Sequence, residues 1–503
     1  MGPNPWTCKI RQAGEEDLNK YLVKIAEKED RLKPYQERAL KKLDKNDGVI
    51  LDHGTGTGKT MTFLTAVERA QKKDKKGRSI IIAPASLTTN VDKEIAKHGL
   101  KIDMSRVDVM SYEKAVIDAD KLRKNKYMLA IMDEGHKMRN IDTKRNTELS
   151  DIVSGANQRI IATATPEYNH ISDIAPLINI VAGGKKVLPE GKKNFEEQYV
   201  HKHTENAPFL KRIFGAPSKE VHTLKNKDDL GRRLNKYMDS YTLGEDEETS
   251  THFPTQTEKV IEVEMSPEQH QLYKYMEGRL PWHLRLKVRT DMPLDKKEHA
   301  QLNAFSSGIR QVSNSTKSFM PQYAQTTPKI RKAADSIQKG IKTDKNFKGL
   351  VYSNYLESGI NDYSEELNRR KIPHGVYTGA LTKTQKDALV KDYNSGKIKV
   401  LMVSSAGGEG LDLKGTKKVQ VMEPHFNSSK INQVIGRAAR YDSHIDLPLK
   451  EQAVEIERYH SIFPPGIFGK SKTISIDTYL AHNSQTKDKL GEQMKELTRP
   501  KKK

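Results

Sequence analysis

The stretch Gly54-Thr55-Gly56-Thr57-Gly58-Lys59-Thr60 lies between the apolar run Gly48-Val49-Ile50-Leu51 and an amphipathic stretch. The amphipathic stretch places apolar residues at the spacing of one helical face, namely Phe63, Leu64, Val67 and Ala70. Glycines let the backbone curl so that its N–H groups face phosphate oxygens, and the N-terminus of the following helix adds a positive dipole end. The order of strand, glycine-rich turn and helix therefore predicts a phosphate-binding loop.

The side chains of this loop predict what the phosphate belongs to. Lys59 is expected to reach the β- and γ-phosphates of a nucleoside triphosphate, and the Thr60 hydroxyl is expected to ligate Mg²⁺. The backbone around the phosphates comes from Gly54, Thr55, Gly56, Thr57 and Gly58. His53 stands where the usual pattern begins with a glycine. A glycine-rich turn without a ligand is the alternative, and the strand and helix on either side favour the phosphate-binding interpretation.

Short apolar runs recur along the chain and alternate with amphipathic stretches. They are 79–83, 127–132 and 159–162 in the first half, and 349–353, 399–403 and 419–422 in the second half. Strands of a parallel sheet are buried on both faces, so they appear as continuous apolar runs. We therefore expect an α/β protein with two parallel-sheet lobes and helical insertions.

The changes in pattern also divide the chain. We expect an N-terminal extension over 1–30, a first lobe over 31–255 and a second lobe over 256–480. The first lobe carries a helical protrusion at about 183–250, and the second a basic helical insertion at about 270–348. From 274 to 348 the chain has 16 Lys and Arg against 6 Asp and Glu. The remaining residues, 481–503, form a basic tail that we expect to be unstructured.

The composition excludes several classes of protein. The net charge is +21, which predicts a partner rich in phosphate. Cys8 is the single cysteine, so a disulfide within the chain and a cysteine-ligated zinc site are both excluded. The apolar runs are far shorter than a bilayer requires, and the first residues lack the apolar core of a secretory signal. We therefore expect a protein of a reducing compartment that does not contact membranes.

A pair of carboxylates, Asp133-Glu134, directly follows the apolar run at 127–132. A carboxylate at that point lies at the carboxyl edge of a parallel sheet, beside the phosphate-binding loop. Asp133 is expected to hold Mg²⁺, and Glu134 is expected to polarise the attacking water. Alone, such a pair is usually a solvated turn, but its place downstream of the phosphate-binding loop favours catalysis.

Two arginines in the stretch 433–440 form the third signal. Arg437 and Arg440 are three residues apart and share one helical face. A cation of this kind stabilises the charge that develops on the γ-phosphate during hydrolysis. An ordinary basic helix is the alternative explanation in a chain with so many cations.

These three motifs, in this order, resemble the core of superfamily 2 helicases, and more narrowly its SNF2-type branch of DNA translocases. The resemblance covers about residues 30–480 and implies two RecA-like lobes, ATP with Mg²⁺ as the cofactors and catalysis by Lys59, Asp133, Glu134, Arg437 and Arg440. It also implies that Gln36, in the stretch 32–36, recognises adenine. The second lobe is expected to contribute further nucleotide contacts, which are Gly410, Asp412 and Gln433.

The same resemblance assigns nucleic-acid contacts to four motifs. Motif Ia supplies Pro84, Ser86 and Asn90, motif Ib supplies Ser111 and Tyr112, motif IV supplies Ser353 and Asn354, and motif V supplies Ser404, Ser405 and Gly407. The sequence departs from the family where Val91 replaces a tryptophan and where the stretch 423–427 replaces Trp-Asn-Pro. The predicted partner is double-stranded DNA, with the protein acting as a monomer on it.

A narrower likeness lies directly after Arg440. The stretch Tyr441-Asp442-Ser443-His444 resembles nucleoside triphosphatases and early transcription factor subunits of large DNA viruses. It implies a viral or bacteriophage origin, a place in the host cytoplasm or the virion, and partners in viral transcription, replication or recombination. We interpret His444 as a structural histidine.

The expected activity is ATP-driven movement along duplex DNA without net strand separation. Aromatic residues, the usual platforms for separated bases, make up only 6% of the chain. Three alternatives stay open: a helicase that separates DNA or RNA strands, an ATP-gated nucleic-acid-binding transcription factor subunit, and the motor of a restriction or recombination complex.

Overall fold

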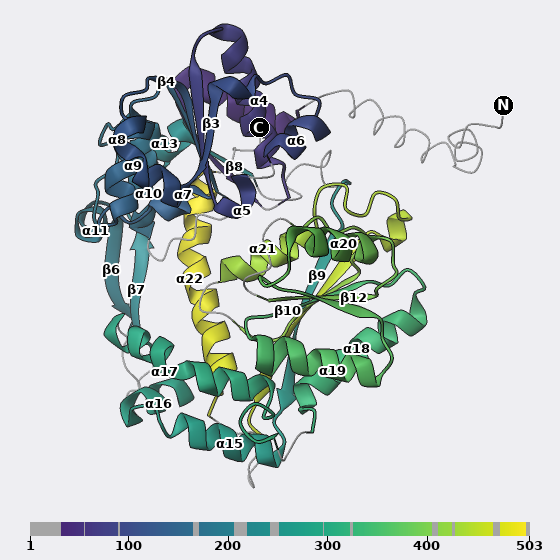
Figure 1. The fold of residues 1–503 in the computed structure, drawn as a ribbon. Coiled ribbons are helices and arrows are strands. Elements are labelled where there is room, and N and C mark those ends of the chain that lie inside the picture. Colours follow the sequence, from purple (N-terminus) through teal and green to yellow (C-terminus); the bar gives the residue numbers. More distant parts are fainter. Residues whose placement is uncertain are drawn as a thin grey trace, which may run out of the picture.

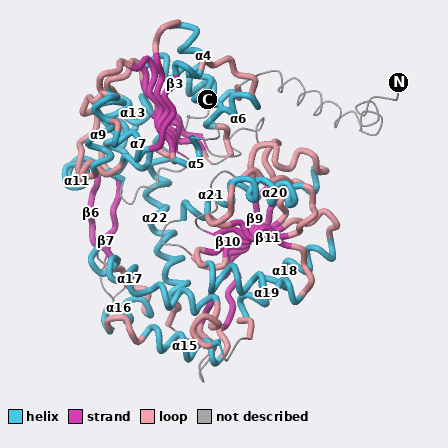
Figure 2. Tube along the Cα trace, in the orientation of Figure 1, coloured by secondary structure: helices cyan, strands magenta, loops and turns pink. Residues whose placement is uncertain are grey.

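Two lobes, each built on a six-stranded parallel sheet, make up the computed structural model of the chain (Figures 1 and 2). The structure describes residues 32–54, 56–88, 91–163, 171–205, 219–241, 251–294, 296–321, 325–404, 411–424, 428–465 and 473–498. The prediction of an α/β fold with two parallel-sheet lobes is confirmed.

The sheet of the first lobe has the strand order β3-β2-β4-β5-β1-β8. Its strands are β1 (Gly48–His53), β2 (Arg78–Ala83), β3 (Val107–Ser111), β4 (Tyr127–Asp133), β5 (Gln158–Thr163) and β8 (Met238–Tyr241). Alternate residues of each strand enter different hydrophobic cores: Ile80 and Ile82 pack in one, and Ile81 packs in the other. Burial on both faces explains why these strands are continuous apolar runs in the sequence.

Helices cover both faces of this sheet. They are α3 (Pro34–Asn46), α4 (Lys59–Lys73), α5 (Ala85–Thr88), α6 (Val91–Lys97), α7 (Tyr112–Ile117), α8 (Ala119–Leu122), α9 (Lys144–Ser154), α10 (Ile174–Val181), α11 (Lys192–Tyr199) and α13 (Lys227–Tyr237), with short 3₁₀ turns η1 (Met104–Arg106), η2 (Gly135–Met138) and η3 (Ile171–Asp173). Helices α3 and α4 share one core with the sheet, whereas α7, α9 and α10 share the other.

The prediction of a helical protrusion at about 183–250 is wrong in part. Between α11 and α13 the chain forms an antiparallel hairpin of β6 (Val200–Glu205) and β7 (Lys219–Leu224), which extends away from the first lobe (Figure 1). Strand β8 then returns to pair with β1 in the main sheet. The β-branched residues of both hairpin strands favour this conformation over a helix.

The sheet of the second lobe has the order β11-β12-β10-β13-β14-β9. Its strands are β9 (Thr255–Glu264), β10 (Gly349–Ser353), β11 (His374–Tyr377), β12 (Val400–Ser404), β13 (Lys418–Val421) and β14 (Ala453–Ile462). Strand β9 follows the connection between the lobes and pairs with β14 along its whole length. The carboxyl ends of β10 and β12 lie side by side in register at Ser353 and Ser404.

The helices of the second lobe fall into two groups. The sheet is covered by α18 (Pro328–Thr343), the π-helical turn η5 (Leu356–Asn361), α19 (Asp362–Arg369), α20 (Lys383–Asn394) and α21 (Ser428–Ala438), with a 3₁₀ turn η6 (Leu449–Glu451). A separate insertion contains α15 (Pro267–Glu277), α16 (Trp282–Arg289) and α17 (Lys296–Asn314). The insertion is shorter than the expected 270–348, because α18 packs in the core beside the sheet.

The expectation of an unstructured C-terminal tail is wrong for residues 481–498. Helix α22 (Ile476–Thr498) begins in the core that the insertion forms and ends on the first lobe (Figure 1). At its far end the Leu497 carbonyl accepts a 2.7 Å hydrogen bond from Asn235 Nδ2, and Ser240 Oγ donates to Thr498 Oγ1 at 2.9 Å. Helix α22 therefore connects the two lobes. Across the described ranges, every helix is too short or too polar to cross a membrane.

Candidate nucleotide site between the lobes

The loop between β1 and α4 has the backbone that a phosphate-binding turn requires. Gly56 and Gly58 have positive φ values of 80° and 76°, which favour glycine. Thr57 Oγ1 donates a 2.7 Å hydrogen bond to the Gly54 carbonyl and closes the turn. A Cβ atom on Gly58 would lie 2.7 Å from Gln36 Nε2, so a larger residue does not fit there. Gly58 is also the N-cap residue of α4, so the helix N-terminus lies directly at the turn, as anion binding requires.

Lys59, the first residue of α4, is held by the loop itself. Its Nζ atom donates hydrogen bonds to the His53 carbonyl at 2.8 Å and to the Gly54 carbonyl at 3.0 Å. Burial lowers the pKa of Lys59 to about 8, although the nearby charges of Glu134 and Asp133 act in the opposite direction. A phosphate would give this ammonium group a charged partner in place of two neutral carbonyls.

The predicted catalytic carboxylates lie at the end of β4, close enough to Lys59 to influence its charge. Asp133 Oδ1 accepts a hydrogen bond from the Glu134 N–H at 2.9 Å. Burial, together with the charge of Glu134, raises the pKa of Asp133 above its usual range. Glu134 has a positive φ of 52°, which is uncommon for a residue with a side chain and is typical of functional sites.

His136 is a site residue that the sequence analysis did not single out. Its Nδ1 atom lies 3.2 Å from Glu134 Oε2. Burial alone would raise the pKa of Glu134, but the hydrogen bond and charge of His136 hold it below its usual value. Glu134 therefore stays ionised beside Asp133, as a residue that polarises water must. The position of His136, two residues after Glu134, was the available signal.

Tyr112 supports these carboxylates rather than lying exposed toward nucleic acid. Its ring is completely buried, and its hydroxyl donates a 2.8 Å hydrogen bond to the Asp133 carbonyl. Lys137 Nζ lies 5.4 Å from the ring centroid, and the Arg145 guanidinium lies 5.3 Å from it. The Tyr112 side chain is therefore not available for the predicted contact with DNA in this conformation.

Gln36, predicted to recognise adenine, is bound to the phosphate-binding loop. Its Nε2 atom donates to the Thr57 carbonyl at 3.1 Å and to the Gly58 carbonyl at 3.2 Å. Its Oε1 atom accepts the Lys33 N–H at 2.8 Å. The Tyr35 hydroxyl also donates to the Thr57 carbonyl, at 2.7 Å. The first turn of α3 and the loop therefore form one hydrogen-bonded unit.

His53, the departure from the usual loop pattern, has a structural partner. Its Nε2 atom lies 2.9 Å from Asp239 Oδ1 on β8. Arg38 contacts both oxygens of the same carboxylate, at 2.9 and 3.0 Å. Burial opposes ionisation of Asp239, but His53 and Arg38 outweigh it and lower its pKa to about 2. The histidine therefore joins β1 to the edge strand of the sheet.

The second lobe brings both predicted arginines to this site. The charge of Arg437 lowers the pKa of both Lys59 and Asp133, so its guanidinium lies close enough to influence them. A Cβ atom on Gly56 would lie 3.1 Å from Arg440 Cα, so the backbone of Arg440 touches the phosphate-binding loop. The Arg440 side chain forms a 3.0 Å ion pair with Asp412. Gln433 lies one turn before Arg437 on α21.

Tyr441 extends this contact between the lobes. Lys33 Nζ lies 4.9 Å from the Tyr441 ring centroid, and the His252 ring stacks on Tyr441 at 4.6 Å. His252 Nδ1 lies 2.8 Å from Asp442 Oδ1. These side chains come from the first lobe, the connection and the second lobe. Sequence reasoning did not find the contact, because its members are far apart in the chain.

The residues present fit Mg²⁺ together with a nucleotide. Thr60 offers a hydroxyl oxygen and Asp133 a carboxylate, which are the ligand types that Mg²⁺ prefers. Within the described ranges, no group of three or more His, Cys, Asp or Glu side chains is arranged to hold a metal ion. Mg²⁺ usually completes its shell with water and phosphate oxygens, so one carboxylate and one hydroxyl are sufficient.

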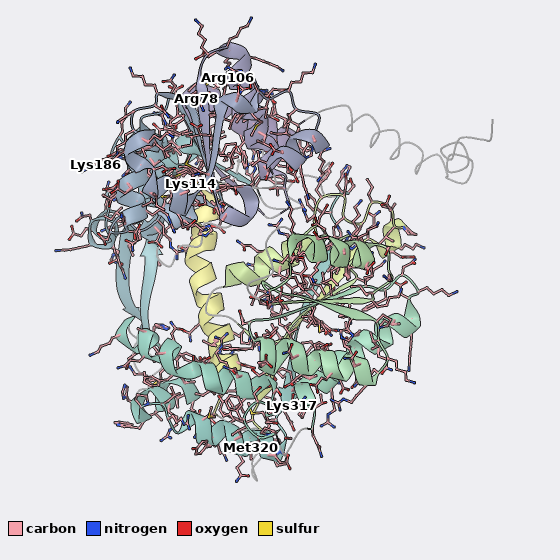
Figure 3. All side chains as sticks on the ribbon, in the orientation of Figure 1. Arg78, Arg106, Lys114, Lys186, Lys317 and Met320 are labelled. Carbon is pink, nitrogen blue, oxygen red and sulfur yellow. The ribbon has the colours of Figure 1, made fainter. Side chains whose placement is uncertain are left out.

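The predicted nucleic-acid residues lie at the carboxyl edges of the two sheets. Pro84 follows β2, and Ser111 caps α7 by accepting the Lys114 N–H at 3.2 Å. Lys114 lies on the side of the first lobe that faces the second, whereas Arg78 and Arg106 lie at its opposite end (Figure 3). Outside the described residues are Thr55, Asn90, Ser405, Gly407 and Gly410, together with the side chain of Ser86.

In the second lobe, the predicted nucleic-acid residues that the structure describes are buried or hydrogen-bonded to other residues of the protein. Ser353 and Ser404 end β10 and β12 and are buried. Ser353 Oγ lies 3.1 Å from Glu423 Oε2, and Asn354 donates its N–H to Oε1 of the same carboxylate. The Ser353 side chain is therefore unavailable for a direct contact with DNA in this conformation.

Comparison with known proteins identifies relatives for both lobes. The SNF2-related domain matches residues 101–321, and the helicase conserved C-terminal domain matches residues 329–442. The res subunit of type III restriction enzymes matches residues 29–168. A protein of Acanthamoeba polyphaga mimivirus, whose name describes an ATP-dependent RNA helicase, is 33% identical over 91% of this chain and 94% of its own length.

Two further similarities have lower identity. A termination factor NPH-I homolog of African swine fever virus is 24% identical over 81% of this chain and 68% of its own length. The SWI2/SNF2 ATPase core of Sulfolobus solfataricus in complex with double-stranded DNA has 16% identity and a TM-score of 0.37 over 93% of this chain and 96% of that chain. The matched domains and the 33% identity to the mimivirus relative show that the chain belongs to the SNF2-related family of helicase-like ATPases.

Proposed function

We propose that the protein hydrolyses ATP between its lobes to move along double-stranded DNA. The observation that carries this proposal is the composition of the nucleotide site. Lys59, Asp133 and Glu134 come from the first lobe, whereas Arg437 comes from the second and influences the charge of Lys59. Hydrolysis therefore depends on how the lobes sit against each other, and the loss of the γ-phosphate changes what holds them together.

The residues of this chain have distinct roles in the proposed reaction. Bound Mg²⁺ would neutralise the phosphate charge, with Thr60 and Asp133 holding it. Lys59 leaves the loop carbonyls and binds the β- and γ-phosphates. Glu134, kept ionised by His136, orients and polarises the attacking water. Arg437 and Arg440 stabilise the charge of the transition state, which requires Arg440 to exchange Asp412 for phosphate.

The proposed DNA path follows the carboxyl edges of both sheets. The motif residues Pro84 and Ser111 lie at this edge of the first lobe, and Ser353 and Ser404 lie at the same edge of the second. Because the side chains of Ser353 and Tyr112 are buried, we propose contacts through backbone N–H groups and neighbouring cations such as Lys114, Lys137 and Arg145. Lobe opening and closing would then step the two edges along one strand.

The names of the viral relatives support a place in viral transcription or replication. One relative is named an ATP-dependent RNA helicase and another is named a termination factor. We therefore propose that the chain acts as a monomer on viral DNA, with partners from the transcription or replication machinery. The monomeric state rests on the fact that the lobes of one chain together supply Lys59 and Arg437.

A pair of assays on one duplex tests translocation. A third strand bound in the major groove is expected to be displaced when ATP is present, while a labelled strand of a forked duplex stays paired. Opening each base-pair step costs about 1.4 kcal/mol of stacking, and tracking an intact duplex avoids this cost. Release of the forked strand with the triplex left intact would instead assign strand separation, which the name of the mimivirus relative favours. If ATP is hydrolysed but neither the third strand nor the forked strand is released, the result would indicate an ATP-gated clamp.

A further inference from the structure

The helical insertion of the second lobe carries a group of large apolar side chains that face solvent. Trp282 is 71% exposed, Tyr275 is 64% exposed and Leu286 is 51% exposed. Single exposed apolar residues are ordinary on a protein surface and need no explanation. These three residues lie within 12 positions of the chain, on the adjacent helices α15 and α16. Their clustering therefore points to a binding surface.

The geometry joins these residues into one patch. Trp282 and Leu286 are one turn apart on α16 and share a face. The Arg279 guanidinium lies 5.3 Å from the Tyr275 ring centroid. A Cβ atom on Gly278 would lie 4.0 Å from Arg285 Nη1, so the end of α15 meets α16. We call Tyr275, Arg279, Trp282, Arg285 and Leu286 the aromatic patch.

The charged residues around the aromatic patch indicate which kind of ligand it binds. Between residues 270 and 310, every carboxylate that the structure describes is in an ion pair: Glu277 with Arg289, Asp291 with His482, and Glu298 with Lys287. In contrast, Arg279, Arg285 and the neighbouring Lys274 form no ion pair within the described part of the chain. The aromatic patch therefore combines exposed rings with cations that have no acidic partner.

Exposed rings beside cations match the chemistry of a single-stranded nucleic acid. Its phosphates attract cations, and its unpaired bases stack on aromatic rings, whereas the bases of an intact duplex are already stacked on one another. We propose that the aromatic patch is a second nucleic-acid site, which binds an unpaired strand of DNA or RNA. Trp282 and Tyr275 stack with the bases, while Arg279 and Arg285 contact the phosphates.

The insertion is fixed beside the proposed DNA path. Helix α17 packs against η5, which follows β10. Arg310 of α17 donates a 3.0 Å hydrogen bond to the Pro424 carbonyl, and Ser358 Oγ of η5 donates to Gln311 at 3.2 Å. The patch lies on the neighbouring helices α15 and α16 of the same insertion (Figure 1). The aromatic patch therefore belongs to an element that is anchored at the carboxyl edge of the second sheet.

The tryptophan content of the chain gives a direct test. Trp6 and Trp282 are the two tryptophans, so in a Trp6→Phe variant all tryptophan emission comes from Trp282. The full chain is titrated without nucleotide against an oligo(dT) strand, an oligo(U) strand of equal length and a blunt duplex. We expect saturable quenching by single strands, weakened by salt, and much less quenching by the duplex. Comparing the oligo(dT) and oligo(U) titrations shows whether the patch prefers DNA or RNA.

Substitutions then separate stacking from charge. Trp282→Ala is expected to weaken single-strand affinity about 5- to 150-fold, the range for the loss of one stacked base. Arg279→Ala is expected to weaken affinity and reduce its dependence on salt. Leu449→Ala, an exposed apolar residue of η6, is the matched control and should leave affinity unchanged. Circular dichroism shows whether each variant is folded.

Two results would overturn the proposal. Constant Trp282 emission at saturating oligonucleotide would show that the strand binds elsewhere. Unchanged affinity of folded Trp282→Ala would show that its ring contributes nothing, and would leave the aromatic patch to a protein with an acidic surface. Because the titration uses no ATP, neither result depends on whether the protein translocates along a duplex.

Discussion

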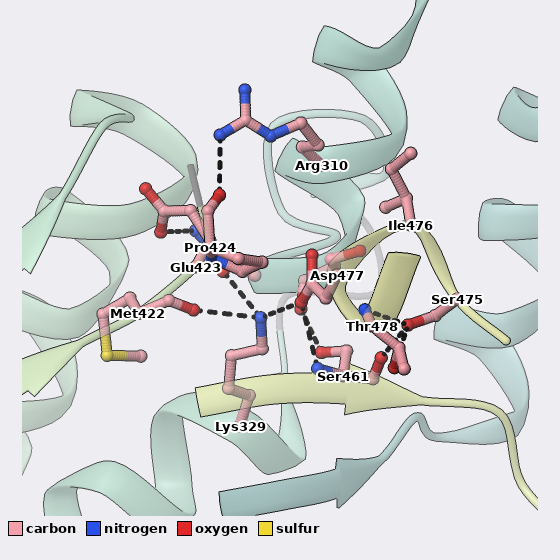
Figure 4. Close-up of polar contacts among 12 residues, drawn as sticks. Arg310, Lys329, Met422, Glu423, Pro424, Ser461, Ser475, Ile476, Asp477 and Thr478 are labelled. Atoms are coloured by element: carbon pink, nitrogen blue, oxygen red, sulfur yellow. Dashed lines mark hydrogen bonds and ion pairs between the residues drawn. The ribbon is translucent and has the colours of Figure 1, made fainter. Parts of the chain in front are cut away.

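The carboxyl edges of the two sheets differ in how their buried charges are satisfied. In the first lobe, Lys59 is held by two neutral carbonyls, and Glu134 has a positive φ. In the second lobe, Lys329 is completely buried but fully bonded (Figure 4). Its Nζ atom donates to Asn314 Oδ1 at 3.0 Å, to the Met422 carbonyl at 3.0 Å and to Asp477 Oδ2 at 2.7 Å.

The bonds of the second lobe continue from Lys329 into a network. Asn314 Nδ2 donates to Glu423 Oε2 at 2.6 Å, and Ser353 Oγ contacts the same carboxylate. Asp477, on α22, also accepts the Ser461 N–H at 3.0 Å. Helices α17, α18 and α22 are thereby fixed to the ends of β10 and β13.

The difference separates a binding site from a scaffold. An ammonium group that lacks a charged partner, beside carboxylates with shifted pKa values, gains stability when a ligand arrives. Lys329, whose three N–H donors all have partners, gains nothing from a ligand and instead holds helices in place. Substitutions at the carboxyl edge of the first lobe's sheet should therefore change turnover. Substitutions at the carboxyl edge of the second lobe's sheet should change stability.

The largest expected effect is on turnover. Arg437→Ala should lower the rate of ATP hydrolysis by about 10³- to 10⁵-fold, because an arginine finger stabilises charge that develops only in the transition state. ATP affinity, measured by equilibrium titration, should stay near that of the wild type. Arg440→Ala should behave in the same way. A parallel loss of affinity and turnover would instead identify the arginines as ground-state binding residues.

The second lobe should respond in stability. Lys329→Met leaves Asp477 buried without its charged partner, and we expect a loss of about 3–5 kcal/mol in the free energy of unfolding. Urea unfolding of both proteins measures the difference. The control is Lys73→Met, which breaks an exposed pair with Asp44 and should cost less than about 1 kcal/mol. An equally small loss for Lys329→Met would show that the network does not hold the lobe together.

Lys59→Ala tests the same comparison in the first lobe, where turnover but not stability should change. Lys59 begins α4, and its ammonium group contacts two backbone carbonyls rather than a packed core, so circular dichroism and the unfolding midpoint should stay close to those of the wild type. Turnover should fall at least about 100-fold, the scale of losing one group that stabilises developing charge. Near wild-type turnover in this variant would remove the basis for assigning the loop to phosphate.

Much of the first edge could be predicted from the sequence, because its chemistry is local. The glycine-rich loop around Lys59, the pair Asp133-Glu134 and the stretch with Arg437 in α21 and Arg440 just after it are each contiguous motifs. The structure corrects one detail, because Arg440 lies beyond the end of the helix that both arginines were expected to share. The strands were also predictable, since burial on both faces leaves continuous apolar runs. The buried state of Tyr112 was not, because its partners Asp133, Lys137 and Arg145 come from other elements.

The contacts at the carboxyl edge of the second lobe's sheet could hardly be predicted from the local sequence. Lys329 and Asp477 are 148 residues apart, and neither belongs to a recognisable motif. The contact between Asn235 and Leu497 spans 262 residues, so the polar tail gave no indication that α22 ends on the first lobe. Such contacts depend on tertiary packing, which overrides the solvated character of a basic segment.

The smallest expected effect concerns the charge of Lys59 itself. Burial lowers its pKa to about 8, and the protonated form is the one that binds phosphate. Below pH 8 the ammonium is mostly charged, whereas each further pH unit above 8 reduces the charged fraction up to about tenfold. ATP affinity, titrated from pH 7 to 9.5, should therefore fall as the pH rises. Lys59→Arg should show no such slope, because a guanidinium stays charged throughout this range. A wild-type affinity that stays constant to pH 9.5 would mean that Lys59 keeps its ordinary pKa, and that the charges of Glu134 and Asp133 fully offset its burial.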